Sequence, residues 1–330
     1  MAKPKFSIGL DCGTSTVKLI RLRSVKDAVE LSDCRIEPAQ LDLEPVFKKM
    51  TQGLDALRVN ISVSAPAAII RYVNFPKMDK EELRQALKFE AQKHIPFSIS
   101  EVNVDSYILK ADMPDNKMLV LLAAVKNDFL SQRLKVIEAA GLRANVIDVD
   151  SLALVNSFNF CCTDDETIKN KTVALLNVGA AFSNLSILDA GIPRLGRDIQ
   201  IAGNALTQRI SEAMGVDYKA AEAIKVSGSS EQRAKAATAI ESVLSNLARE
   251  VRVSFDYYES QNASSVGKIF ISGGSSSFPG LKDMLAAILG IEVECWDPLK
   301  KLKLASNLPA DSLKPSSAQL AVALGLALRA

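Results

Sequence analysis

The segment Asp11–Lys18 combines a carboxylate, three hydroxyl side chains, a glycine and a lysine within eight residues. A turn of small polar residues between two strands can direct several backbone N–H groups toward one anion. Lys18 could then contact phosphate oxygens, and Asp11 could hold a hydrated Mg²⁺ through water as a hard oxygen ligand. An ordinary hairpin turn would use the same residue types, so the segment alone leaves both interpretations open. The turn residues are Gly13, Thr14, Ser15 and Thr16.

A second segment, Asn177–Asn184, has the same plan 166 residues further along the chain, with Asn177 in the place of Asp11. Its candidate contacts also include Gly179 and Ser183. If the two segments face each other across a cleft, they can hold a polyphosphate from both sides. Asn177 differs from Asp11 in that it has no charge to offer a cation.

A third segment, Ser272–Gly280, lies between an expected strand and an expected helix. The paired Gly273 and Gly274 would let the backbone approach a flat ligand, and the N-terminus of the following helix favours anions. Ser275 and Phe278 complete the candidate contacts. No Gly-Lys-Ser/Thr follows and no G-x-G-x-x-G occurs, which excludes a Walker A loop and a Rossmann fingerprint. A glycine-rich connector that binds nothing remains the alternative.

Two near-repeated hairpins must position these segments. Phe6–Leu22 reads as a short apolar strand, a turn of small polar residues and a second strand, and Val173–Leu188 repeats that order. Two copies half a chain apart predict a duplicated α/β architecture with two similar lobes. We expect lobe I in residues 1–165 and lobe II in residues 166–330, divided at the polar stretch Cys161–Lys171.

An α+β insertion is expected in lobe I at residues 75–143, from the order helix, strand, strand, helix. Asp79 would cap its first helix. Lobe II should contain a helical subdomain at residues 212–265, and an apolar helix at residues 317–330 should close back toward lobe I. Arg194 and Arg197 are expected in a turn after the second hairpin, with their charges in solvent.

The composition is that of a globular domain, with 48% hydrophobic and 24% charged residues. The formal net charge of +2 gives no field over the whole chain that would recruit nucleic acid or an anionic membrane. Five cysteines without a C-x-x-C, together with a single histidine, leave almost no ligands for a zinc site. The uncharged stretch Thr172–Leu188 contains polar residues and a glycine, so it indicates two strands and not a membrane span.

The three segments, in this order and at these spacings, resemble the actin–chaperone–sugar-kinase ATPase superfamily. The resemblance makes Asp11–Lys18 the first phosphate motif, Asn177–Asn184 the second and Ser272–Gly280 the adenosine motif. It implies an actin-like ATPase fold whose two lobes close over ATP and Mg²⁺. Glu222 and Lys225 match an A-E-x-x-K stretch whose acid and lysine flank the ribose and base. The alternative for that pair is a solvated helix face with an ion pair.

A more specific resemblance is to the PilM family of type IV pilus assembly proteins, which is similar to the cell-division protein FtsA. The matching stretches are Asn74–Met78, Glu81–Leu83, Glu90-Ala91, Ile95–Phe97, Gly191–Leu206 and Pro315–Leu326. The resemblance implies an FtsA-type (SHS2) insertion and a cytoplasmic ATP-binding scaffold of the pilus or a related secretion inner-membrane complex. It further implies that the short N-terminal tail of a PilN-like inner-membrane protein binds in a groove beside the insertion.

The same resemblance implies a protein peripheral to the inner membrane through its partner, without a direct membrane anchor or nucleic acid, and leaves room for a homo-oligomer. Where the family usually has an acid, this chain has Asn177, so we expect weak or absent ATPase activity. Asp150 stands 27 residues earlier, near where chaperone relatives place a catalytic acid, and could orient an attacking water. A helix N-cap explains the same residue.

Two other functions suit the same fold. A small-molecule kinase would need a carboxylate base beside the acceptor hydroxyl, and no loop offers an acid with sugar-binding neighbours. A polymerising, FtsA-like membrane adaptor would need an amphipathic anchor, and the C-terminal stretch is apolar around most of its circumference. Both are kept as alternatives to the scaffold.

Overall fold

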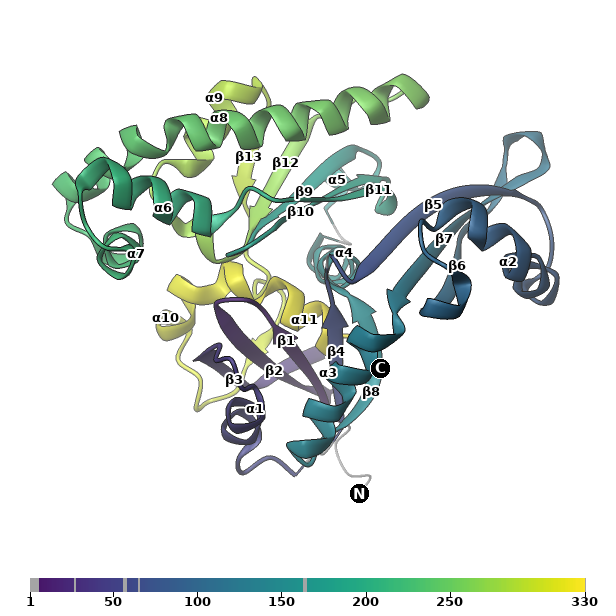
Figure 1. Cartoon of the computed structure of the whole chain (residues 1–330), viewed down its shortest axis with the longest axis horizontal. Coiled ribbons are helices and arrows are strands. Elements are labelled where there is room, and N and C mark those ends of the chain that lie inside the picture. Colours follow the sequence, from purple (N-terminus) through teal and green to yellow (C-terminus); the bar gives the residue numbers. More distant parts are fainter. Residues whose placement is uncertain (1–5, 27, 56–57, 65, 163–164, 330) are drawn as a thin grey trace.

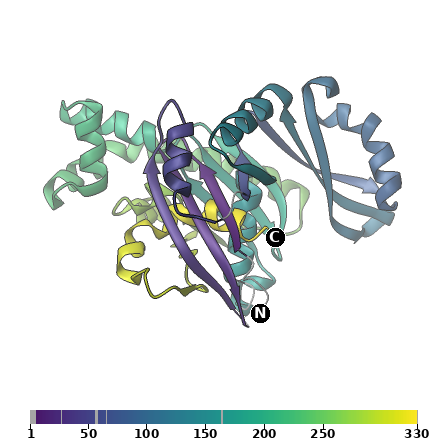
Figure 2. The ribbon, with the colours of Figure 1, turned by 90° about the horizontal axis from the view of Figure 1, so that it is seen from below.

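The computed structural model describes residues 6–329 apart from 27, 56–57, 65 and 163–164. The positions 163–164 fall within the expected lobe boundary and lie outside the described residues. Two lobes stand side by side, and a smaller insertion projects from lobe I (Figure 1). The insertion and α7 (Tyr218–Ser227) lie at opposite ends of the molecule, which a second view also shows (Figure 2).

Lobe I is built on a six-stranded sheet in the order β14-β3-β2-β1-β4-β8. Its first hairpin is the predicted one, with β1 and β2 antiparallel and β4 parallel to β1. The helices α1 and α3 cover one face of the sheet, and α4 and α11 cover the other. The strands are β1 (Phe6–Cys12), β2 (Thr16–Val25), β3 (Ala28–Pro38), β4 (Arg58–Val63), β8 (Arg143–Val149) and β14 (Lys303–Leu304). The helices are α1 (Glu44–Thr51), α3 (Asn127–Ala139), α4 (Asp150–Cys162) and α11 (Ala321–Ala327).

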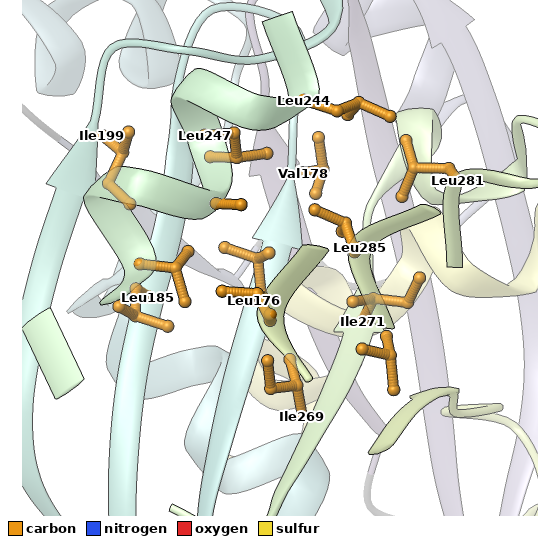
Figure 3. Close-up of a cluster of buried hydrophobic side chains, with 14 of the residues drawn as sticks. Leu176, Val178, Leu185, Ile199, Leu244, Leu247, Ile269, Ile271, Leu281 and Leu285 are labelled. Carbon is orange, nitrogen blue, oxygen red and sulfur yellow. The ribbon is translucent and has the colours of Figure 1, made fainter. Parts of the chain in front are cut away.

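Lobe II repeats the plan with a five-stranded sheet in the order β11-β10-β9-β12-β13. A single apolar core fills the space between this sheet and its helices, and Figure 3 shows Leu176, Leu244 and Leu285 meeting there. The strands are β9 (Thr172–Val178), β10 (Ser183–Asp189), β11 (Ile192–Ile199), β12 (Lys268–Ser272) and β13 (Glu292–Cys295). The helices are α5 (Glu166–Lys169), α6 (Gly203–Met214), α7, α8 (Ser230–Gln261) and α9 (Leu281–Leu289).

The insertion is a three-stranded antiparallel sheet in the order β5-β7-β6, with one helix packed on it. That helix begins with the predicted cap: the Asp79 carboxylate accepts from two backbone amides, and Glu82 closes a capping box. The elements are β5 (Ala68–Pro76), α2 (Lys80–His94), β6 (Val102–Met113) and β7 (Lys117–Lys126).

Three details differ from the sequence-based expectations. The insertion spans Ala68–Lys126, and α3 lies outside it, because the buried Ile137 of α3 packs into the core of lobe I. Arg194 and Arg197 lie in strand β11 and not in a turn, and they pair with Asp189 and Glu250. The last helix is shorter than expected. A 3-10 helix covers Lys314–Leu320, and α11 begins at Ala321.

The C-terminal helix α11 packs tightly between β1 and α4. A Cβ atom added to Gly325 would lie 1.7 Å from the carbonyl oxygen of Ala153, and one added to Gly9 would lie 2.1 Å from that of Ala323. Neither approach is possible with any side chain, so these two glycines fix how closely the chain end lies against lobe I.

Replacing Gly325 with alanine should therefore destabilise the protein, although alanine normally favours a helix by about 1 kcal/mol over glycine. Overpacking of this kind costs about 1–3 kcal/mol or more, because backbone must move. Urea unfolding of Gly325→Ala measures the loss. The control is Gly267→Ala, where the nearest atom to an added Cβ is 4.0 Å away. Equal stability of the two variants would contradict the close packing of α11 on α4.

Candidate functional site

The first hairpin brings its carboxylate and its lysine together. Asp11 and Lys18 lie opposite each other in the β1–β2 register, and Lys18 Nζ is 2.9 Å from Asp11 Oδ2. Both side chains are almost buried. Thr14 and Ser15 are exposed at the tip of the turn, so their hydroxyls are accessible to a ligand. Asp11 and Lys18 therefore form an ion pair next to a solvent-exposed turn.

Asp150 joins this pair from the start of α4. The pKa of Asp150 is raised to about 7, chiefly by burial and also by the negative charges of Asp11 and Asp198, against the lowering effects of the Ser62 hydrogen bond and of Lys18. An acid that is half-protonated near neutral pH is suited to exchanging protons with a water or a phosphate. The electrostatic interactions with Asp11 and Lys18 place Asp150, the first residue of α4, near the first hairpin.

The second and third segments contact each other directly. The Ser272 hydroxyl donates to Asn177 Oδ1 at 3.3 Å, and the Ser275 hydroxyl donates to the carbonyl oxygen of Gly179 at 3.2 Å. Gly273 adopts a φ of 92°, and an added Cβ would lie 2.5 Å from the carbonyl oxygen of Val178. The fold itself thus requires glycine at position 273.

Gly274 is different. Its φ is not in the left-handed region, and an added Cβ would find only Gln319 Oε1, at 3.9 Å. The folded protein has room for a Cβ atom there, so the packing of the described residues gives no reason for glycine in place of alanine. A ligand that lies against the backbone would give one.

Asn177 is connected to an acid that the sequence analysis did not single out. Asn177 Nδ2 donates to Asn184 Oδ1 at 3.3 Å, and Asn184 Nδ2 donates in turn to Asp198 Oδ1. Burial raises the pKa of Asp198, and the hydrogen bond from Asn184 lowers it. Asp198 also acts electrostatically on Asp150, so it connects lobe II to the lobe I cluster. No sequence motif marks Asp198, which lies directly opposite Asn184 in the β10–β11 register only in the folded structure.

Glu222 and Lys225 lie next to the third segment. Lys225 Nζ is 2.7 Å from Glu222 Oε2 and donates to Thr207 Oγ1 at 2.8 Å and to the Gly203 carbonyl oxygen at 3.3 Å. Only 8% of Lys225 is exposed, so the alternative of a solvated helix face is wrong for this residue. The Ser275 hydroxyl lies against Gly203, where an added Cβ would be only 2.3 Å from Ser275 Oγ. The A-E-x-x-K pair is therefore continuous with the glycine-rich segment.

Two of the expected site residues lie elsewhere. The side chain of Phe278 is buried in the apolar core of lobe II, where it packs with the residues of α8 and α9 and not at the surface of the site. The hydroxyl of Ser183 is fully buried and donates to the carbonyl oxygen of Ile201 at 2.7 Å. Neither side chain is placed to contact a nucleotide, because each is already enclosed by its own lobe.

Metal ligands are sparse. Within the described residues, no group of three or more His, Cys, Asp or Glu side chains is arranged to hold a metal ion. Asp11 pairs with Lys18, and Asp150 interacts electrostatically with both of them. This arrangement suits a hydrated cation held through water better than one bound directly by several side chains.

A separate groove of about 570 Å³ lies beside the insertion. Its lining includes the consecutive residues Asn103–Tyr107 of β6 and Ile147–Val149 of β8. Successive side chains of a strand point to opposite faces, so a groove lined by consecutive residues must run along the edge of each strand. β6 is the last strand of the insertion sheet and β8 the last strand of the lobe I sheet. The groove therefore lies between two open strand edges.

Apolar side chains provide most of the remaining lining. Leu109, Leu121, Ala123 and Val125 come from the insertion, and Leu152 and Val155 come from α4. Open strand edges beside an apolar surface are the features that bind an extended peptide as an added strand.

Among the helices of the described residues, none combines the length and apolar character that crossing a membrane requires.

Two lobes that each begin with a hairpin, with an insertion in the first lobe, define an actin-like ATPase fold, as expected from the sequence. The chain belongs to the family of type IV pilus assembly protein PilM, whose family model matches residues 9–330. The resemblance inferred from the sequence is thereby confirmed.

Two solved structures are similar over nearly the whole chain. One is a chain of a PilM–PilN type IV pilus biogenesis complex, with 25% identity, a TM-score of 0.86 and coverage of 98% of each chain. The other is the ethanolamine utilization protein EutJ from Carboxydothermus hydrogenoformans, with 13% identity and a TM-score of 0.58. It covers 99% of this chain and 91% of EutJ, and it supports the fold alone.

The raised pKa of Asp150 predicts a pH-dependent effect of Asp150→Asn on stability. The folded protein retains a proton on Asp150 between about pH 4 and pH 7, where the unfolded chain has lost it. The free energy of unfolding of the native protein should therefore fall relative to that of the variant as the pH rises through this window, by about 1.4 kcal/mol per pKa unit.

Urea unfolding of both proteins at several pH values measures this difference. The control is Asp256→Asn, on the exposed side of α8. If the free energies of unfolding of Asp150→Asn and Asp256→Asn both change with pH as that of the native protein does, Asp150 does not have a raised pKa.

Proposed function

We propose that this protein is a nucleotide-binding scaffold of a type IV pilus, or related secretion, inner-membrane assembly complex. It binds the short N-terminal tail of a PilN-like membrane protein in the groove between β6 and β8. The observation that carries this proposal is the groove itself. It offers two open strand edges and an apolar wall, in a chain similar over 98% of its length to one from a PilM–PilN complex.

ATP binds between the lobes in this proposal. Asp11, Gly13, Thr14, Ser15, Thr16 and Lys18 contact its phosphates from lobe I, and Asn177 and Gly179 contact them from lobe II. Gly273, Gly274 and Ser275 lie under the adenosine, with Glu222 and Lys225 at the ribose and base. The support is that the second and third segments are in direct contact and that Asp198 and Asp150 connect them to the first.

The Asp11–Lys18 pair could serve both the nucleotide and its cation. Lys18 would contact phosphate oxygens, and Asp11 would accept hydrogen bonds from the water shell of Mg²⁺. The cation would neutralise part of the phosphate charge. The residues fit this role because Asp11 and Asp150 provide oxygens beside a single lysine.

Hydrolysis is slow or absent in this proposal. Asn177 cannot act as a base, and Asp198 is separated from it by the Asn184 amide. Asp150 is the remaining candidate for orienting a water, and its raised pKa leaves it partly protonated at neutral pH. Nucleotide binding then acts by setting how the two lobes lie relative to each other.

Gly274 gives a direct test of nucleotide binding. Because an added Cβ at Gly274 meets no atom of the described residues closer than 3.9 Å, Gly274→Ala should keep its thermal midpoint but weaken Mg-ATP binding at least about tenfold, measured by isothermal titration calorimetry. Gly267→Ala is the matched control that leaves affinity unchanged. Unaltered ATP affinity in Gly274→Ala, or no nucleotide binding by the native protein, would remove the nucleotide part of the proposal.

The protein resides in the cytoplasm and reaches the inner membrane through its partner. This part of the proposal rests on the groove and on the similarity to a chain of a PilM–PilN complex.

Filling the groove tests the partner site. Ala123 lies half-buried on β7 in the wall of the groove, so Ala123→Phe should lower affinity for the synthetic N-terminal tail of the PilN-like protein of the same organism at least about tenfold. Fluorescence anisotropy of the labelled tail measures binding. Val253→Phe, on the exposed side of α8, is the matched control. Equal affinities for both variants would place the tail elsewhere.

A further inference from the structure

A buried carboxylate lies at the partner groove. Asp148 is the next-to-last residue of β8, and only 2% of its side chain is exposed. Its Oδ1 accepts a hydrogen bond from the backbone N–H of Val149 at 2.8 Å. Its Oδ2 is fully buried and has no well-formed hydrogen bond among the described residues. A buried carboxylate oxygen without a hydrogen bond is costly, so something must compensate its charge.

The compensation comes from the end of the chain. Arg329 Nε lies 2.9 Å from Asp148 Oδ2, and both residues line the groove. Nε is the nearest guanidinium nitrogen to Asp148 Oδ2, and its geometry does not make a hydrogen bond. Guanidinium–carboxylate pairs are strongest when two parallel N–H···O bonds form. Nearly half of the Arg329 side chain is exposed, so it can move away into solvent.

The backbone of Arg329 is held by hydrogen bonds, whereas its side chain is partly exposed. Asn60 Nδ2 donates to the carbonyl oxygens of Leu326 and Arg329. Asn60 is itself held by Asn145, whose Nδ2 donates to Asn60 Oδ1 at 3.0 Å. The chain therefore presents one partly exposed cation beside one buried anion at the edge of the groove.

We propose that Asp148 is a specificity-determining residue of the groove, which accepts a cationic side chain of the bound segment in exchange for Arg329. This inference rests on the proposed function, because it concerns the occupant of the same groove. The occupant is then an extended, mainly apolar peptide with one arginine or lysine placed at the end of β8. The apolar walls and strand edges bind its length, and Asp148 fixes its register.

The rest of the groove supports a requirement for positive charge. The charged lining residues are Asp105, Asp148 and Arg329, so once Arg329 has moved away only carboxylates remain. Burial raises the pKa of Asp148, and the charge of Arg329 lowers it, which shows that the carboxylate depends on a neighbouring cation. An arginine or lysine brought by the peptide replaces that cation, whereas a neutral peptide leaves Arg329 in place.

The test compares two synthetic forms of the PilN-like N-terminal tail that differ only in charge. In one form each arginine or lysine is kept, and in the other each is replaced by citrulline or acetyl-lysine. The native protein should bind the charged form at least about tenfold more tightly, as measured by fluorescence anisotropy. Asp148→Asn should remove most of that difference, and Asp105→Asn, at an exposed carboxylate in the same groove, should retain it.

Arg329→Gln provides a test of opposite sign. If Arg329 competes for Asp148, its removal should tighten binding of the charged tail several-fold and leave the neutral tail unchanged. If Arg329 is an ordinary wall residue, its removal should weaken both. This variant also keeps the proposal testable if Asp148→Asn does not fold.

The outcomes separate this inference from the proposed function. Binding of both tails with equal affinity to the native protein, or weaker binding of the charged tail by Arg329→Gln, would overturn the role of Asp148 and leave the groove as the partner site. Binding of neither tail would overturn the proposed function and this inference with it.

Discussion

The close packing of the C-terminal helix α11 between β1 and α4 is the constraint on which both candidate sites depend. Gly9 and Gly325 allow backbone to approach backbone, and α4 is thereby fixed against the lobe I sheet. The start of α4 carries Asp150 into the cluster with Asp11 and Lys18, and its side lines the groove with Leu152 and Val155. The end of α11 delivers Arg329 to the same groove. One packing interface therefore positions the residues of two sites.

The fold and most of the candidate site could be predicted from the sequence because their signals are local. The two hairpins follow from alternating strands around small-residue turns, and the cap at Asp79 follows from residue types three positions apart. The lobe II core follows from the apolar periodicity of α8 and its strands. Such patterns depend on neighbours in the chain, which a sequence displays directly.

What could not be predicted depends on contacts between distant segments. Phe278 fits a nucleotide contact by its place in the glycine-rich segment, but the core of lobe II encloses it. Asp198 has no motif of its own and gains its place only through pairing with Asn184. The assignment of α3 to lobe I and the pairing of Asp148 with Arg329 depend on the folded arrangement in the same way.

Lobe I is built from both ends of the chain, and this has a consequence for how the protein folds during synthesis. Its sheet receives β14 from residues near 303, and its core receives Leu320, Ala323 and Leu324, so lobe I contains both early and late parts of the chain. The strands and large helices of lobe II come from one continuous stretch between Thr172 and Cys295. On the ribosome, lobe II can therefore fold as a unit before the C-terminal residues of lobe I have been made. Until then, one apolar face of the β1–β4 region stays exposed to solvent. That interval is when the nascent protein is most open to aggregation or to binding by a chaperone.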